Sequence, residues 1–151
     1  MKYDFSDDIQ RGILYLSKYS RDFYLQISSL VRPEYFEYPI HSNIYQAISD
    51  YYEEYKDIPK DLHLLECVKD HKGSKEDLSD YDDELHRVNS MDASCIGHTE
   101  FFLDIIEKFA QKSAMREAIT SSISLLKDDR MGEIEHLVRE ALCINRNVDL
   151  G

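Results

Sequence analysis

The sequence of 151 residues has no tryptophan, only three prolines, five glycines and three cysteines. So few turn-forming residues argue against a β protein, which needs a proline- or glycine-rich turn after each short strand. No stretch approaches the roughly 18 consecutive apolar residues of a membrane-spanning helix, and no signal peptide opens the chain. Cys67, Cys95 and Cys143 are odd in number and lack CxxC spacing, which indicates reduced thiols. We therefore expect a soluble, cytoplasmic, all-α protein.

Basic residues are also scarce. The chain has 18 Lys and Arg against 30 Asp and Glu, which gives a formal net charge of −12. Affinity for nucleic acid comes largely from Lys and Arg that release counterions, and a surface this acidic repels phosphate. We expect little direct nucleic-acid binding and a preference for basic protein partners.

Motifs for nucleotide hydrolysis are missing as well. The glycines open neither a Walker A loop nor a G-x-G-x-x-G turn; they are Gly12, Gly73, Gly97, Gly132 and Gly151. The sequence therefore predicts no catalytic residue, no metal site and no cofactor in this chain.

Apolar residues at helical spacing account for most of the chain. Ser6 and Ser20 are placed to cap the first two helices, and Pro33 ends the second. Pro39 suits the first turn of a third helix that runs to Tyr55. Further helices are expected at about residues 62–68, 76–90, 93–127 and 134–142, with turns at 72–74 and 128–132.

The last two helices form an αα-hairpin over residues 113–144, with an apolar stripe on each helix. One stripe contains Met115, Ile119, Ile123 and Leu126, and the other contains Ile134, Leu137, Val138 and Leu142. Two helices cannot enclose a core, so the hairpin either folds back on the preceding domain or pairs with another chain. Lys112 and Arg116 interrupt the first stripe, which favours pairing as a four-helix bundle.

Two polar groups could in principle carry chemistry. His63, Cys67 and His71 share one helix face at i, i+4 and i+8, but a straight helix spreads them over two turns, so a structural role is favoured over zinc binding. The other group lacks the glycine and spacing of a calcium loop and is expected to be a solvated face; it consists of Asp77, Asp80, Asp82, Asp83 and Glu84.

The segment from Leu30 to Ile48 combines an aromatic corner, Glu34-Tyr35-Phe36, with the run His41-x-x-Ile44-Tyr45-x-x-Ile48. This pattern resembles the N-terminal domain of DnaB-family replicative DNA helicases. The longer gap between the corner and Ile44 is more similar to phage helicases of the T-even type. The segments 55–59 and 109–115 fit the same comparison.

The resemblance implies a globular helical subdomain at 1–92, a long helix and hairpin at 93–144, and the start of a linker at 145–151. In that family the hairpins pair between subunits into a collar on a hexameric motor ring, and the collar docks primase and, in some systems, a loader. The eight stripe residues would then be the subunit interface, as a dimer or a trimer of dimers. ATP and magnesium would belong to a motor domain outside this sequence.

Three alternatives stay open from the sequence. The first is the helicase-binding domain of a primase, which has a similar helical bundle and hairpin. The second is a free-standing acidic phage protein that binds a host factor by imitating DNA, although its acids alternate with apolar stripes rather than forming rows. The third is a small enzyme.

Overall fold

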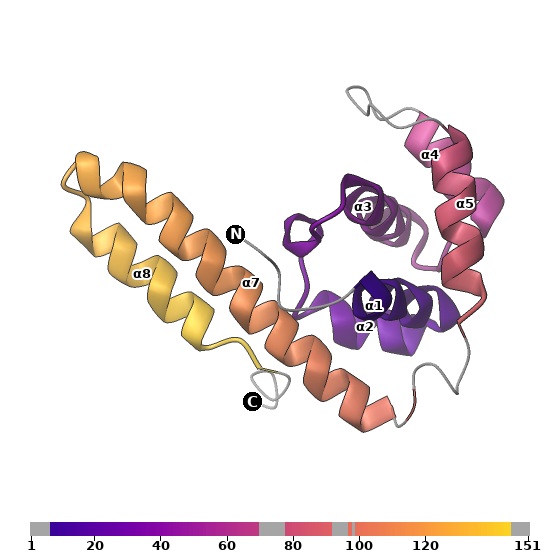
Figure 1. Ribbon diagram of the computed structural model, residues 1–151, viewed down its shortest axis with the longest axis horizontal. Helices are drawn as coiled ribbons and strands as arrows, with labels where there is room; N and C mark the ends of the chain where they lie inside the picture. The colour runs from indigo at the N-terminus through magenta and orange to yellow at the C-terminus, as the bar shows by residue number, and fades with distance from the viewer. Residues whose placement is uncertain (1–6, 70–77, 92–96, 98, 146–151) are drawn as a thin grey trace.

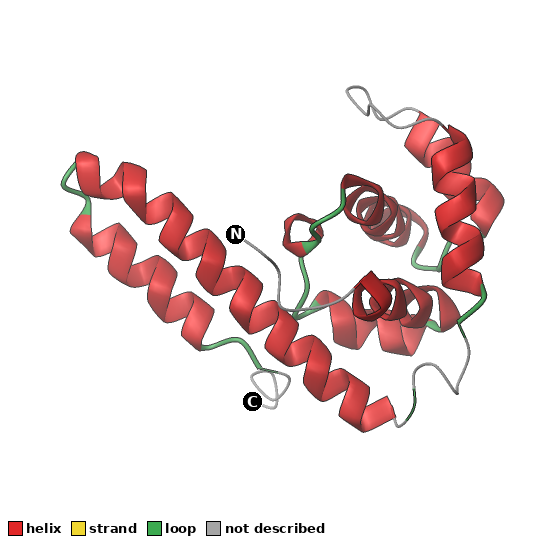
Figure 2. Ribbon diagram, in the orientation of Figure 1, coloured by secondary structure: helices red, strands yellow, loops and turns green. Residues whose placement is uncertain are grey.

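The computed structural model describes residues 7–69, 78–91, 97 and 99–145. Over these ranges the chain forms helices and no strand, so the all-α prediction is confirmed (Figures 1 and 2). The elements in chain order are α1 (Asp7–Tyr19), α2 (Arg21–Ser28), the 3₁₀ helix η1 (Pro33–Tyr35), α3 (Pro39–Tyr55), α4 (Asp61–Lys69), α5 (Leu78–Asn89), α7 (Thr99–Lys127) and α8 (Met131–Leu142). Figure 1 shows α1 to α5 gathered in one body, from which α7 and α8 extend as a protruding hairpin.

Local signals set the start of α2 and the bounds of α3 as expected, whereas α2 ends earlier than the expected Leu30-Val31. The Ser20 hydroxyl accepts a hydrogen bond from the Phe23 amide at 3.1 Å and caps α2. Pro39 is the first residue of α3, and Lys56 ends it in the left-handed region at φ 55°. The predicted bounds of the third helix are confirmed. The second helix ends two residues before Leu30, which is buried just beyond it.

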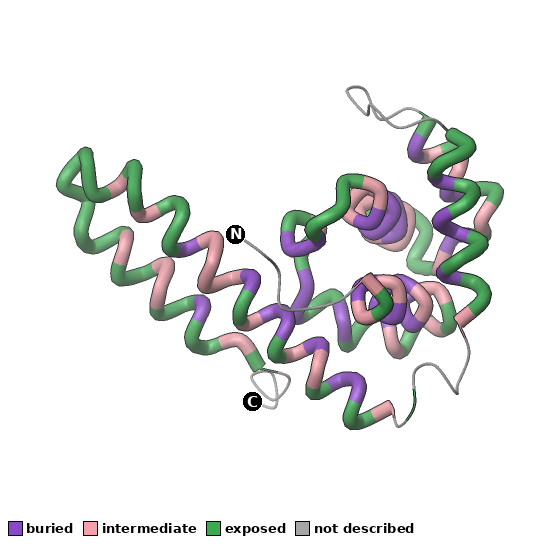
Figure 3. The backbone as a smooth tube through the Cα atoms, viewed as in Figure 1, coloured by how far each residue is buried: buried purple, intermediate pink, exposed green. Residues whose placement is uncertain are grey.

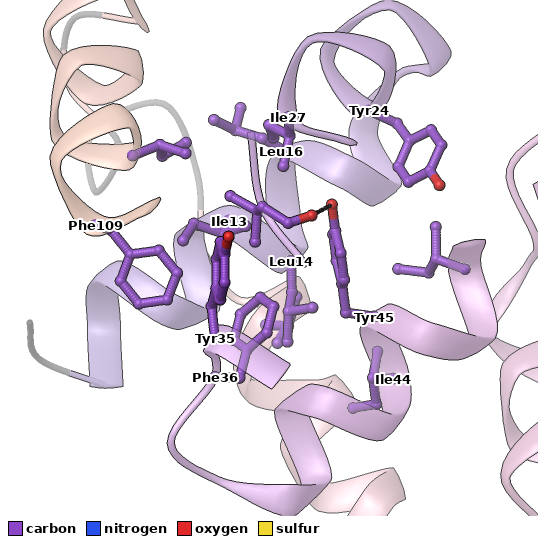
Figure 4. Packing of buried hydrophobic residues seen from close by; sticks show 14 of the residues in the cluster. Ile13, Leu14, Leu16, Tyr24, Ile27, Tyr35, Phe36, Ile44, Tyr45 and Phe109 are labelled. Atoms are coloured by element: carbon purple, nitrogen blue, oxygen red, sulfur yellow. Dashed lines mark hydrogen bonds between the residues drawn. The ribbon is translucent and has the colours of Figure 1, made fainter. Parts of the chain in front are cut away.

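The aromatic corner around η1 joins the body to the long helix α7. Phe36 packs against Tyr45 and against Phe109 of α7, with ring centroids 5.2 and 5.8 Å apart. The Tyr45 hydroxyl donates a hydrogen bond to the Val31 carbonyl at 2.9 Å, so the chain entering η1 is tied to α3 (Figure 4). Aromatic pairs at this spacing add specific geometry to the area they bury.

The core of the body lies between α1, α2, α3, α4, α5 and the first half of α7, and Figure 4 shows part of it. Its fully buried aliphatic side chains include Ile13, Leu14, Ile27, Ile44, Ile48, Leu64 and Ile106. Gly12 allows α1 and α7 to approach each other, because a Cβ atom there would lie 2.4 Å from the tip of the Phe102 ring. A close approach of this kind is one of the few positions that require glycine inside a helix.

The long helix begins later than the sequence predicts. The prediction of one unbroken helix from about Ala93 is wrong at Gly97, whose φ of +73° lies outside the helical region; α7 starts at Thr99. Glycine adopts this conformation without the steric cost that a Cβ brings. The expected boundary at 92–93, the cap at Ser6, the turn at 72–74 and most of the linker at 145–151 lie outside the described residues.

Candidate protein interface on the helical hairpin

The helix α7 is anchored in the body over its first half only. Its buried residues are Phe102, Leu103, Ile106, Phe109, Ala110, Ser113 and Ala118. Beyond Ser113, only Ala118 is buried, and Figure 3 shows mostly exposed and half-buried positions from there to the hairpin tip. The second half of α7 therefore projects from the body with α8 as its neighbour.

A tight turn closes the hairpin. Asp129 lies in the left-handed region at φ 56°, and the Arg130 amide donates to the Leu125 carbonyl at 2.9 Å. Between this turn and the body, Ala118 of α7 and Ala141 of α8 are each 4% exposed, which marks where the two helices touch. Small side chains at these positions let the helix axes approach closely, so the hairpin is held by its own packing.

One side of the hairpin, which we call the apolar flank, consists of two rows of apolar side chains. At 100° per residue, these rows are turned in the same rotational sense away from the touching alanines, by roughly 20° to 140° around each helix axis. The two rows lie on the same side of the antiparallel pair, because the residues on the opposite side of both helices line one shared hollow. The apolar flank comprises Met115, Ile119, Ile123, Leu126, Met131, Ile134, Val138 and Leu142.

The structure places seven of the eight predicted interface residues on this flank. Ile119, Ile123, Leu126 and Leu142 are 56, 58, 55 and 69% exposed, while Met115, Ile134 and Val138 are half-buried. Leu137 lies elsewhere, in the hollow on the opposite side.

Met131, which is 60% exposed at the start of α8, also belongs to the flank, although it is not among the predicted interface residues. Its position three residues before Ile134 continues the same helical spacing and could have identified it.

Exposed apolar side chains that are gathered on one surface, as on this flank, differ from the scattered ones found on any soluble protein. The flank contains five side chains that are at least 55% exposed; three lie on consecutive turns of α7 toward the tip, and Met131 lies at the start of α8. A patch of this kind is the usual mark of a protein interface. The arrangement has no chemistry beyond apolar packing, so what it can do is bind another apolar surface.

A buried polar cluster lies inside the body, where Glu84 of α5 contacts residues of α1 and α3 as well as of its own helix. Its carboxylate accepts hydrogen bonds from Arg11 Nε at 2.6 Å, from His41 Nε2 at 2.6 Å and from Arg87 at 3.0 Å. Glu84 is 5% exposed and His41 is 2% exposed. The expectation that Glu84 belongs to a solvated acidic face is therefore wrong.

The periodicity of α5 holds the signal for this burial. Glu84 follows Tyr81 by three residues and precedes Val88 by four, so it lies within the stripe that packs on the body. Its partner Arg11 comes from α1, 73 residues away, which no local pattern indicates.

The ionisation of this cluster follows from its contacts. Burial opposes charge on Glu84, but the hydrogen bonds from Arg11 and His41 outweigh it and lower its pKa to about 2. Burial lowers the pKa of His41 below its ordinary value, although Glu84 partly opposes this. Glu84 is therefore a fixed anion that ties α1, α3 and α5 together, and its oxygens are occupied by donors rather than open to a substrate.

The face of α4 that contains His63 and Cys67, for which the sequence favours a structural role, packs against neighbouring residues in the part of the chain that the structure describes. The His63 ring stacks on Tyr51 at 5.5 Å, and its Nδ1 accepts from the Lys60 amide. Cys67 is half-buried and packs on the core, and His71 lies outside the described residues. Across the described ranges, no three side chains of His, Cys, Asp or Glu are grouped as metal ligands.

The remaining acids of the predicted cluster lie at the surface, at Asp80, Asp82 and Asp83, while Asp77 falls outside the described ranges.

None of the helices described is both long enough and apolar enough to cross a membrane. The sequence matches no protein-family model and no curated protein.

Proposed function

We propose that this chain is the N-terminal collar domain of a hexameric replicative DNA helicase, in which hairpins of neighbouring subunits pair through their apolar flanks. The observation that carries the proposal is the exposed apolar flank on a hairpin that projects from the body. It is supported by the resemblance of residues 30–48 to DnaB-family helicases, and by the confirmed all-α fold with a projecting hairpin.

The energy of pairing can be bounded from the exposed side chains. Burying an apolar side chain completely is worth about 1.5–3 kcal/mol, so covering one that is 55–69% exposed contributes about 1–2 kcal/mol. A symmetric pair covers ten such side chains, five from each copy, worth about 10–20 kcal/mol if all are covered. Association costs about 4–15 kcal/mol. Pairing is therefore favourable when most of the flank is covered.

A two-fold axis between two hairpins places the same flank on both sides of the contact and produces a four-helix bundle. Three such dimers would form the collar of a six-membered ring. In this role the chain has no catalytic residue, and it works in the cytoplasm, that of the host cell if it is encoded by a phage. ATP and magnesium would act in a separate motor domain, and the collar would offer docking surface to primase or a loader.

The test is the molar mass in solution, measured by sedimentation or light scattering over a range of concentrations. The wild type should self-associate, and the double variant Ile123→Asp with Leu142→Asp should be a folded monomer. Leu62→Asp is the matched control, because Leu62 is 69% exposed on α4, far from the flank, and should leave association unchanged.

Two results would contradict the proposal. A wild type that stays monomeric at the highest concentration reached would mean that the flank does not pair. A double variant that loses its helical circular dichroism would mean that these side chains hold the hairpin together internally.

A further inference from the structure

The side of the hairpin opposite the apolar flank contains a hollow of about 330 Å³ where α7, α8 and η1 meet. Its walls have small side chains at Ala114, Ala118, Ser121 and Ala141, which leave space beside the line where the two helices touch. Tyr35 of η1 closes the end toward the body, and the apolar lining is completed by Leu137 and Ile144. This volume is near the lower end of the roughly 300–1,000 Å³ typical of binding pockets.

The hollow stays open when two hairpins pair through their apolar flanks. Ala114, Ala118 and Ser121 follow each other at i, i+4 and i+7 on α7. Ala118 lies on the line where the two helices touch, and Ala114 and Ser121 are turned roughly 40–60° from it, away from the apolar flank. Pairing through Ile119 and Ile123 therefore covers a different face. One hairpin can contact a second copy and another partner at the same time.

The rim of the hollow is acidic. Glu117 and Glu140 lie on its two sides, and Arg32 is the cation among its lining residues. Glu140 faces His136 at 3.0 Å on the exposed surface of α8. Glu117 is half-buried and has no hydrogen bond or ion pair among the described residues.

The surroundings of Glu117 disfavour its negative charge. Burial raises its pKa, the nearby carboxylate of Glu34 raises it further, and Arg32 and Arg116 offset this only in part. A cation placed beside Glu117 would stabilise its ionised carboxylate, because the arginines nearby offset the effects of burial and of Glu34 only in part. The electrostatic complement of the rim is therefore a Lys or Arg side chain.

We propose that this hollow is the docking site for a basic amphipathic helix of a partner protein, which places an aliphatic side chain between α7 and α8 and a Lys or Arg beside Glu117 and Glu140. The groove between two antiparallel helices accepts a third helix by ordinary ridge-into-groove packing. The net charge of −12 draws basic partners to the whole surface, and the hollow orients one of them. The biological role of this site rests on the proposed function, in which the collar binds a partner protein at this surface.

The probe is a synthetic helical peptide with aliphatic residues at i, i+4 and i+7 and lysines on either side, and a second peptide has glutamates in place of the lysines. Binding to the full ¹⁵N-labelled chain is followed by amide chemical shifts. The lysine peptide should shift the amides of Ala114, Ser121 and Ala141, and the glutamate peptide should bind at least about tenfold more weakly.

Three variants locate the site. Glu117→Lys with Glu140→Lys should weaken binding of the lysine peptide at least about tenfold, and Ser121→Phe should do the same by filling the hollow without a change of charge. Glu53→Lys with Glu54→Lys is the matched control, since it changes the net charge equally on the exposed end of α3, and it should change affinity less than about twofold. Circular dichroism confirms that each variant is folded.

Several outcomes would overturn the proposal. Equal weakening by the control pair would mean general attraction to an acidic surface, and shifts concentrated at Ile119 and Ile123 would place the peptide on the apolar flank. A reduced molar mass of Ser121→Phe would mean that a second copy occupies the hollow. Because the Glu117 and Glu140 variant should keep the molar mass of the wild type, failure of docking and failure of hairpin pairing are separate results.

Discussion

Replacing Glu84 by Gln tests whether the buried carboxylate stabilises the body. The change keeps the size of the side chain and removes the charge that Arg11, His41 and Arg87 share. Lowering the pKa of Glu84 from 4.5 to about 2 corresponds to about 3 kcal/mol of stabilisation of its ionised form by folding. Arg87 is 59% exposed, so water screens part of this, and we expect Glu84→Gln to lose about 2 kcal/mol at pH 7.

The pH dependence of this loss has a definite sign. Because the pKa of Glu84 is lower in the folded chain, its contribution is fully present above about pH 4.5 and is lost as the pH falls toward 2. Urea unfolding followed by circular dichroism should therefore show a difference between wild type and variant that persists from pH 7 to 5. Below pH 4.5 the difference should shrink.

The matched control is Asp82→Asn on the same helix, where the carboxylate faces His86 at 3.5 Å in an exposed pair. Its loss should stay below about 0.5 kcal/mol. A Glu84→Gln variant as stable as this control would refute the reasoning. A loss that stays the same from pH 7 to pH 3 would refute it too, since the effect would then come from packing rather than charge.

Three further substitutions test the packing of the body, each by urea unfolding. Tyr45→Phe removes the hydroxyl that donates to the Val31 carbonyl and should cost about 1–3 kcal/mol, because a buried acceptor loses its donor. Phe109→Ala empties a fully buried position where α7 meets the corner and should cost about 3–5 kcal/mol; a cost below 1 kcal/mol would mean that α7 is not anchored there. Gly12→Ala should cost about 1–3 kcal/mol by overpacking against Phe102, and adding Phe102→Leu should restore part of the loss.

The sequence predicts those features of the fold that depend on neighbouring residues. Pro39 fixes the start of α3, and the Ser20 cap fixes the start of α2, because both act within one helical turn. The apolar flank is predictable for the same reason, since Ile119 and Ile123 recur at the period of a helix regardless of what they contact. Helical spacing alone assigns these residues to a face.

Features that join distant segments are not predictable in this way. The burial of Glu84 depends on Arg11, and the need for Gly12 depends on the ring of Phe102, 90 residues further along the chain. Leu137 matches the apolar period of α8, yet it lines the hollow rather than the apolar flank. The apolar stripe of α8 is wide, and the side on which α7 packs against it decides which of its residues face the hollow. The helical period shows which face of a helix is apolar, but only the tertiary contacts show which residues of that face are covered and which stay exposed.

The unbroken course of α7 has a mechanical consequence. Its 29 residues correspond to a rod of roughly 43 Å, with neither proline nor glycine between Thr99 and Lys127 to serve as a joint. One end of this rod is clamped by Phe109 and its neighbours, and the other carries the apolar flank. Any tilt imposed on the free end must swing the whole body through the same angle, so a contact made at the tip sets the orientation of surfaces far from it.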